Sequence, residues 1–246
     1  MNGKVYIGTS GWSYRHWIGR FYPVEIKTKE WLNHYSRFFN TVEINSSFYH
    51  LISEKTYAKW YDTVPEKFQF AVKMSRFVTH VKRLGDVSEP LDNFLKGVLR
   101  LKEKLGIILV QLPPSMKFDV KRIENFIQIL YDKKVLPTIR VSFEVRNQTF
   151  LCDRFYDILR KNKIALCFSD WPGVEVDNPV IADYIYIRRH GPKSLYASNY
   201  TDDDLKKDLE MMRDVLNKGM DSYIYFNNDA YAFAVDCCFR IKEMLK

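Results

Sequence analysis

Val42-Glu43-Ile44-Asn45, which closes the short apolar run Thr41–Asn45, shows the pattern that decides the fold. Apolar and polar side chains alternate in it, as in a β-strand whose two faces meet different surroundings. Most of the comparable runs in the chain also end in a polar or charged residue. There are eight: Val5–Gly8, Thr41–Asn45, Phe68–Lys73, Ile107–Leu112, Ile139–Arg146, Ile164–Asp170, Tyr184–His190 and Tyr223–Asn228.

Segments with helical spacing of apolar residues separate these runs. Ser53 and Asp119 are candidate N-caps of two of them, and Thr201 with Asp204 forms a capping box for a helix that we expect to end at Gly219. The helices expected on this basis cover Thr28–Phe39, Glu54–Asp62, Leu91–Leu105, the segment after Asp119, Phe150–Lys161, the segment after Thr201, and a last helix from near Asp229 almost to Lys246.

Eight strands that alternate with helices predict an α/β fold of one domain over residues 1–246, a (β/α)8 barrel of the TIM type. An open doubly wound sheet also has this alternation, but the number of repeats and the polar residues at the strand ends favour the barrel. The segment Trp171–Ala182, which follows the sixth run and contains two prolines, predicts an irregular repeat at that point.

Composition narrows the possible partners. The 246 residues carry a formal net charge of +8, which favours anionic partners such as phosphorylated small molecules or nucleic acid, although a basic surface by itself is an alternative. No apolar run approaches the ~20 residues of a membrane span, and no secretory signal precedes the first strand. We therefore expect a cytoplasmic protein without a membrane partner. The composition does not indicate an oligomeric state.

Barrels of this type place their working residues at the C-terminal ends of the strands. Alternation predicts that Glu43 and Asn45 face the barrel interior. It predicts the same for Ala71, Lys73, Gln111, Ser142, Glu144, Arg146, Tyr186, Arg188, His190, Tyr225 and Asn227. For the sixth strand, either Cys167 with Ser169 or Phe168 with Asp170 faces inward.

Several of these segments together resemble the YecE-like family, a domain-of-unknown-function family. The resemblance covers nearly the whole chain and rests on the order and spacing of its motifs. They are Ile7-Gly-Thr-Ser-Gly-Trp-Ser-Tyr14, Val42-Glu-Ile-Asn-Ser-Ser-Phe-Tyr49, Phe70-Ala-Val-Lys73, Val110-Gln-Leu-Pro-Pro114, Glu144-Val-Arg146, Tyr186-Ile-Arg188 and Phe226-Asn-Asn228. The resemblance implies a TIM-type barrel with a pocket at the strand ends, and it implies no particular activity.

Paired carboxylates are the first candidate chemistry. Glu43 and Glu144 face each other across the predicted barrel mouth and are candidate general acid and base, provided that their surroundings separate their pKa values. Asp170 is a supporting catalytic candidate. Lys73 is expected to pair with Glu43 on the neighbouring strand. The alternative is a network of ion pairs that only fixes the register of the barrel.

Anion binding is the second candidate. Lys73, Arg146, Arg188 and His190 gather positive charge at the strand ends, and Asn227 and Asn228 lead into the last helix, where barrels of this type often bind phosphate. Three further residues, Asn45, Gln111 and His80, complete the substrate contacts that we predict on this side of the barrel.

The loop Gly11–Tyr22 places aromatic residues among basic ones. Trp12, Tyr14 and Trp17 are candidates to cover a ligand, and Tyr196 and Tyr200 of the loop after the seventh strand are expected to meet them. The alternative is a hydrophobic lid that fills the barrel mouth.

The leading hypothesis is an enzyme with hydrolytic or general acid–base chemistry on a phosphate-bearing or nucleic-acid-derived substrate. A nucleic-acid-binding protein without catalysis is one alternative. A metal-dependent sugar isomerase or hydrolase is another, with Glu43, Glu144, Asp170, His190 and His80 as possible ligands. No cofactor is predicted, because the sequence has no phosphate loop, dinucleotide fingerprint or Gly-x-Ser-x-Gly motif.

Overall fold

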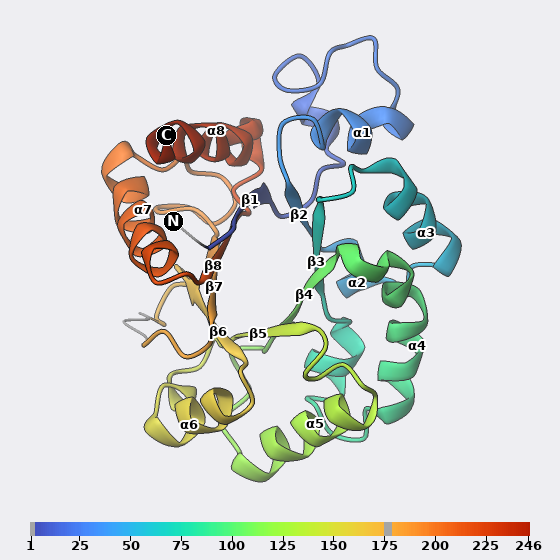
Figure 1. The fold of residues 1–246 in the computed structure, drawn as a ribbon, viewed down its shortest axis with the longest axis vertical. Coiled ribbons are helices and arrows are strands. Elements are labelled where there is room, and N and C mark those ends of the chain that lie inside the picture. The colour runs from blue at the N-terminus through green and yellow to red at the C-terminus, as the bar shows by residue number, and fades with distance from the viewer. Residues whose placement is uncertain (1–2, 175–178) are drawn as a thin grey trace.

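The computed structural model describes residues 3–174 and 179–246. Eight parallel strands form one sheet in the order β1-β8-β7-β6-β5-β4-β3-β2, and helices surround it (Figure 1). This arrangement confirms the α/β barrel expected from the sequence. The strands are β1 (Val5–Thr9), β2 (Thr41–Ile44), β3 (Gln69–Lys73), β4 (Leu105–Gln111), β5 (Arg140–Glu144), β6 (Ala165–Ser169), β7 (Tyr184–Arg189) and β8 (Asp221–Phe226).

The expected N-caps of the helices are confirmed. The side chains of Ser53, Asp119 and Thr201 each accept a hydrogen bond from the backbone N–H three residues later. The α-helices are α1 (Trp31–Tyr35), α2 (Ser46–Tyr49), α3 (Glu54–Thr63), α4 (Ser88–Val98), α5 (Val120–Asp132), α6 (Asp153–Lys161), α7 (Asp202–Asn217) and α8 (Phe233–Leu245). Shorter helical turns are η1 (Arg15–Trp17), η2 (Thr28–Glu30), η3 (Phe77–Val81), η4 (Leu99–Lys104), η5 (Gln148–Phe150) and η6 (Ala230–Ala232).

Some of the expected helices are shorter than their apolar spacing indicated. The expected helix Leu91–Leu105 ends at Val98, because the segment continues as the tighter turn η4 and Lys102 there has a φ of 47°. The last helix starts at Phe233 instead of near Asp229, since Tyr231 and Ala232 also have positive φ. Of the expected irregular segment Trp171–Ala182, residues 175–178 lie outside the described residues, and the rest contains no helix or strand.

Side chains of the strands divide between two apolar clusters, as alternation predicts. The outer cluster lies between the strands and the helices and includes Val42, Phe143 and Ile187. The inner cluster fills the barrel with Tyr6, Ala71, Ile107, Leu109, Ala165, Cys167, Tyr184, Tyr186, Tyr223 and Tyr225. Cys167 therefore decides the open question for β6, whose inward residues are Cys167 and Ser169 and whose outward residue is Phe168. The charged groups lie above this inner layer.

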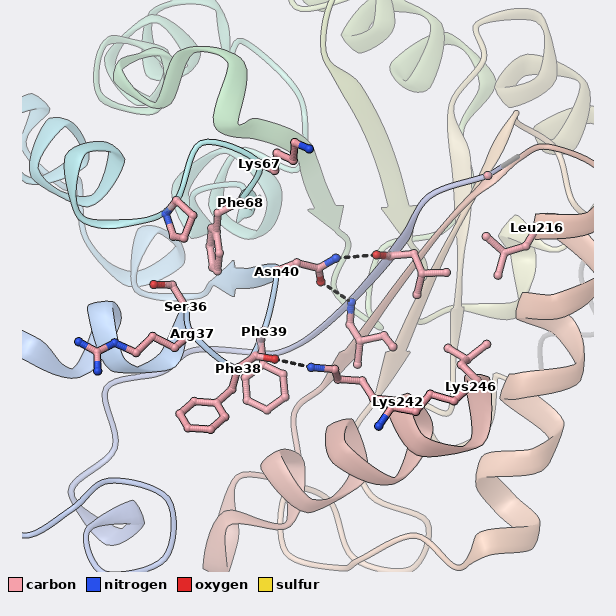
Figure 2. Close-up of a pocket in the computed structure, with 15 residues that line it drawn as sticks. Ser36, Arg37, Phe38, Phe39, Asn40, Lys67, Phe68, Leu216, Lys242 and Lys246 are labelled. Atoms are coloured by element: carbon pink, nitrogen blue, oxygen red, sulfur yellow. Dashed lines mark hydrogen bonds between the residues drawn. The ribbon is translucent and has the colours of Figure 1, made fainter. Parts of the chain in front are cut away.

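The junction between β1 and β2 differs from the other seven, which are parallel ladders. At its N-terminal end the Asn40 side chain replaces the ladder, since its Oδ1 accepts from the Ile7 N–H at 3.1 Å and its Nδ2 donates to the Val5 carbonyl at 2.6 Å (Figure 2). The Tyr35 hydroxyl accepts from the Thr9 N–H at 2.9 Å in the same way. Side chains thus close the N-terminal part of this junction, and at its C-terminal end the Gly11 N–H donates to the Glu43 carbonyl at 2.8 Å.

Candidate functional site

Arg188 of β7 is the centre of a buried ionic network at the C-terminal end of the barrel. Its side chain is 1% exposed and lies between two fully buried carboxylates. Its Nε and one terminal nitrogen donate to Glu43 of β2 at 2.9–3.1 Å, and the other terminal nitrogen donates to Glu144 of β5 at 3.1 Å. The hydroxyl of Tyr186 donates to Glu43 at 2.5 Å. Arg188 is therefore a counter-ion for two glutamates, and the expectation that it holds a ligand anion is wrong.

Both glutamates are held in the ionised form. Burial alone would raise the pKa of Glu43, but the charge and hydrogen bonds of Arg188 outweigh it and hold the pKa below its ordinary value. Burial likewise opposes ionisation of Glu144, while Arg146 and Arg188 hold its pKa well below the ordinary range. The separation of pKa values that a general acid and base require is not found. Neither glutamate is protonated near pH 7, so neither can serve as the acid.

His190 joins this network to Asp170. Because Arg188 can only donate, its 2.6 Å contact with Nε2 makes that atom the acceptor, and Nδ1 carries the proton toward Asp170 at 3.2 Å. The carboxylate of Asp170 also accepts from the His190 backbone N–H and from the Tyr200 hydroxyl. Burial and the neighbouring Arg188 lower the pKa of His190, so the imidazole is neutral. Both of its ring nitrogens are occupied, which argues against direct binding of an anion.

Arg146, which follows β5, forms the outer part of the network. Its Nε donates to Glu144 at 3.0 Å, and its guanidinium lies 3.5 Å from the ring centroid of Trp171. The side chain retains 10% exposure, whereas Arg188 below it is almost fully covered. Arg146 is therefore the arginine of this cluster that a ligand can reach, and its stacking on an aromatic ring holds the guanidinium plane in position.

Lys73, the last residue of β3, does not pair with Glu43 as expected. No ion pair or hydrogen bond of its ammonium group occurs within residues 3–174 and 179–246, and Nζ instead lies 4.1 Å from the ring centroid of Phe48. Glu43 is occupied by Arg188, which explains the difference. Burial, reinforced by the charges of Arg188 and Arg146, lowers the pKa of Lys73 to about 7. Lys73 is thus a lysine that exchanges its proton near neutral pH.

Two other predicted contacts, His80 and Gln111, lie on this side of the barrel. His80 packs against the edge of Phe48 at 4.9 Å between ring centroids, and its Nδ1 is 2.8 Å from the Thr79 hydroxyl. Burial, together with the charge of Lys73, lowers the pKa of His80 to about 4, so it is neutral. Gln111 is buried and donates to the Leu112 carbonyl at 2.7 Å. Gln111 therefore stabilises the strand end and is not directed at a ligand.

The first loop contributes to a groove beside the mouth. Trp12, Tyr14 and Asn45 line this groove of about 540 Å³ between the loop and α3, together with Trp60, whose ring is perpendicular to that of Trp12. Trp17 is different, because it is fully buried and its indole N–H donates to the Asp229 carbonyl at 3.0 Å. The role of Trp17 is packing, so the prediction that it covers a ligand is wrong.

The phosphate site expected between β7 and the last helix is not formed. Asn228 is buried and donates to the Ser198 carbonyl at 3.0 Å, while Asn227 is 8% exposed. In the first turn of α8, the Ala234 N–H donates to the Asn228 carbonyl at 3.0 Å, so this helix N–H is already occupied. With Arg188 paired as well, the described residues at this end of the barrel show no open donor set of the expected kind.

The loop after β7 reaches the mouth through Tyr196, whose ring lies 6.0 Å from that of His190 and is 39% exposed. Asp170 and Tyr200 line a second groove of about 720 Å³ next to β6. A third hollow of about 590 Å³, shown in Figure 2, lies at the opposite end of the barrel beside Asn40 and is mostly apolar. It is remote from the ionic network, so we place the candidate site at the mouth.

Within the described part of the chain, no group of three or more His, Cys, Asp or Glu residues is arranged to hold a metal ion. Two of the carboxylates that a metal-dependent reaction would use, Glu43 and Glu144, are already neutralised by arginines.

No helix of the described residues has the length and apolar character to cross a membrane.

Sequence reasoning missed several residues of the site. Tyr186 was placed on the inner face of its strand, but its bond to Glu43 depends on the geometry across the barrel. Trp171 lies in an irregular segment where no periodicity indicates its direction. Phe48 follows a strand end in the motif Ser46-Ser-Phe-Tyr49, and its position next to Lys73 comes from the short helix α2.

Comparison with known proteins agrees with the barrel fold. A family model described as "Protein of unknown function DUF72" matches residues 6–246. The chain belongs to the DUF72 family. A DUF72 protein of known structure from Thermotoga maritima superposes on this chain with a TM-score of 0.86 at 29% identity, covering 98% of this chain and 99% of that one.

Curated relatives of this DUF72 chain include the UPF0759 protein YunF of Bacillus subtilis, 31% identical over 62% of this chain and 54% of YunF. The UPF0759 protein YecE of Escherichia coli K12 is 28% identical over 45% of this chain and 38% of YecE. The chain thus matches about half the length, or less, of these relatives. A D-psicose 3-epimerase with a TM-score of 0.59 at 11% identity, over 97% of each chain, shares the fold alone.

Proposed function

We propose that the chain is an enzyme that binds a phosphate-bearing small molecule at the barrel mouth and acts on it by acid–base chemistry. The observation that carries the proposal is that a partly exposed arginine, Arg146, and a lysine without a counter-ion lie in the same mouth. Glu43 and Glu144 pair with Arg188 and Arg146, and Lys73 remains without a carboxylate partner among the described residues. An anionic ligand would supply a counter-ion for Lys73.

Arg146 and Lys73 together suit a phosphoryl group. Arg146 presents a guanidinium that lies 3.5 Å from the ring centroid of Trp171, and guanidinium groups bind phosphate oxygens through paired, charge-assisted hydrogen bonds. Lys73 is the group in the mouth whose proton is exchangeable near pH 7, which is the property that a general acid or base needs. This assignment replaces the glutamates by Lys73 as the proton-transfer residue.

The test is ligand binding to Arg146→Gln compared with Arg154→Gln. Arg154 forms an exposed pair with Glu124, so its replacement controls for the loss of one positive charge. Isothermal titration with sugar phosphates, nucleotides and inorganic phosphate should find a compound whose Kd weakens about tenfold or more in Arg146→Gln only. Failure of every phosphorylated compound to bind would contradict the proposal.

A nucleic-acid-binding protein without catalysis predicts a different result. Affinity for an oligonucleotide would then fall steeply as salt rises, and both arginine variants would lose the same small amount, because the contacts would be spread over the basic exterior. Equal sensitivity of the two variants would therefore favour that function over a site at the mouth.

A further inference from the structure

Lys73 is surrounded by charged groups from several elements, and none of them is bonded to it. Its residue is 8% exposed at the end of β3, with Nζ over the face of Phe48. The groups whose charges act on it are Arg188 from β7, Arg146 and Glu144 from the β5 end, and Glu43 from β2. His80 of η3 is neutral, and its ring contacts the ring of Phe48 in a perpendicular arrangement.

A second buried lysine shows what the ordinary arrangement is in this chain. Lys104, the residue just before β4, is 6% exposed. Its ammonium donates to the carbonyls of Tyr61 and Val64 at 2.7 and 2.8 Å. Buried charges are almost always bonded in this way, since an unpaired ammonium in the interior is costly. Lys73 departs from the rule at the functional end of the barrel, and the departure favours a neutral amine.

A neutral amine has a free electron pair, which an ammonium lacks. The pKa of Lys73, lowered by burial and by the two arginines to about 7, leaves a large share of this side chain neutral at physiological pH. An ordinary lysine is neutral in only about one molecule in a thousand there. In the ionic network beside it, the Nε2 of His190 accepts from Arg188 and both arginines are permanently protonated, so these groups offer no free electron pair.

We propose that Lys73 is a nucleophile that forms an imine with the carbonyl carbon of an aldehyde or ketone substrate. The inference rests on the proposed function for the position of the substrate, whose anionic group would lie against Arg146. The Nζ electron pair attacks the carbonyl carbon, and the carbonyl oxygen leaves as water with both amine hydrogens. The imine is hydrolysed by the reverse steps, so no oxidant or reductant takes part.

The ring of Phe48 has a positioning role in this proposal. Nζ lies 4.1 Å from its ring centroid, so the ring covers one side of the amine and limits the directions from which a carbonyl group can approach.

Reductive trapping tests the proposal on the intact chain. Glycolaldehyde, which has no phosphate, is added with sodium cyanoborohydride at about pH 7, and the modified lysines are identified by peptide mass spectrometry. We expect Lys73 to be modified about tenfold or more faster than exposed lysines, because its neutral share is larger. Lys104 is the internal control and should remain unmodified, since it is buried and bonded.

The pH profile of trapping distinguishes a reactive amine from a merely accessible one. The rate at Lys73 should rise to a plateau with a midpoint near the pKa of about 7, whereas exposed lysines continue to gain reactivity at higher pH. Lys73→Met, which should fold, must lose this component. The proposal is overturned if Lys73 stays unmodified at about pH 8 while exposed lysines react.

A second arm separates this proposal from the proposed function. Glycolaldehyde phosphate replaces glycolaldehyde, with Arg146→Gln and Arg154→Gln as the matched pair. Trapping of Lys73 by both aldehydes at equal rates would support the amine nucleophile and contradict the phosphate site. Binding of phosphorylated compounds that depends on Arg146, without trapping at Lys73, would support the phosphate site and contradict the nucleophile.

Discussion

Glu43→Gln is the substitution whose effect on folding is most clearly determined by the structure. The carboxylate is fully buried and receives donors from Arg188 at 2.9–3.1 Å and from Tyr186 at 2.5 Å. Glutamine keeps the shape but replaces one oxygen by an NH2 group, which faces donors. Arg188 is then left with the single carboxylate of Glu144 in a buried environment.

Removal of one partner from a buried ion pair costs about 3–5 kcal/mol of unfolding free energy. For a domain of this size, each kcal/mol corresponds to about 2–4 °C in Tm, so the variant should melt about 6–20 °C lower. Urea unfolding followed by circular dichroism measures the change directly. We therefore expect Glu43→Gln to be strongly destabilised.

Glu54→Gln is the matched control for this experiment. Glu54 pairs with Arg100 at the surface, where both side chains are about half exposed, and such pairs contribute about 0–1 kcal/mol. A Glu43→Gln variant that unfolds within about 1 kcal/mol of the unchanged chain would refute the reasoning. That result would mean that the carboxylate is not the buried counter-ion of Arg188.

Three further predictions concern acid, the β1–β2 junction and a close backbone approach. The pKa values of Glu43 and Asp170 are lowered in the folded chain, so the stability that these carboxylates contribute is complete above their ordinary pKa values of 4.5 and 3.8. This stability is lost as the pH falls through the lowered values, so the urea midpoint should drop between about pH 5 and about pH 3. A urea midpoint that does not change with pH in this range would contradict these shifts. Asn40→Ala leaves the Ile7 N–H without its acceptor and should cost about 1–3 kcal/mol, with faster amide hydrogen exchange at Ile7; unchanged exchange would show that the bond does not protect this amide. Gly8→Ala places a β-carbon 2.2 Å from a backbone carbonyl oxygen of β2 and should lower Tm, whereas an unchanged Tm would mean that the strands separate freely at this point.

The sequence predicts much of the fold because two periodicities are strong in it. Strand alternation placed Glu43, Glu144 and Arg188 inside the barrel, and all three are there. Alternation says which face a side chain occupies, but it does not say which residue it meets across the barrel. For this reason the partner of Glu43 was expected on the neighbouring strand, at Lys73, and is found on β7.

Local backbone geometry set a second limit to prediction. The positive φ of Tyr231 and Ala232 delays the start of α8 to Phe233, and no residue type in that segment signals it. The position of Trp171 over Arg146 likewise depends on an irregular segment. Ionisation states were also beyond reach, since they follow from burial and from partners that only the folded chain brings together.

The junction between β1 and β2, where the Asn40 and Tyr35 side chains supply hydrogen bonds, is the weakest join in the barrel wall. Seven joins between strands are backbone ladders, whereas the N-terminal end of the eighth depends on side-chain hydrogen bonds that contribute only about 1 kcal/mol each. Its C-terminal end has a backbone bridge between Ser10 and Glu43. The groove beside Asn45 lies at one end of this junction, and the hollow of Figure 2 lies at the other. Loosening of the side-chain bonds therefore widens the hollow of Figure 2 first, because the backbone bridge at Glu43 holds the opposite end of the junction, next to the groove.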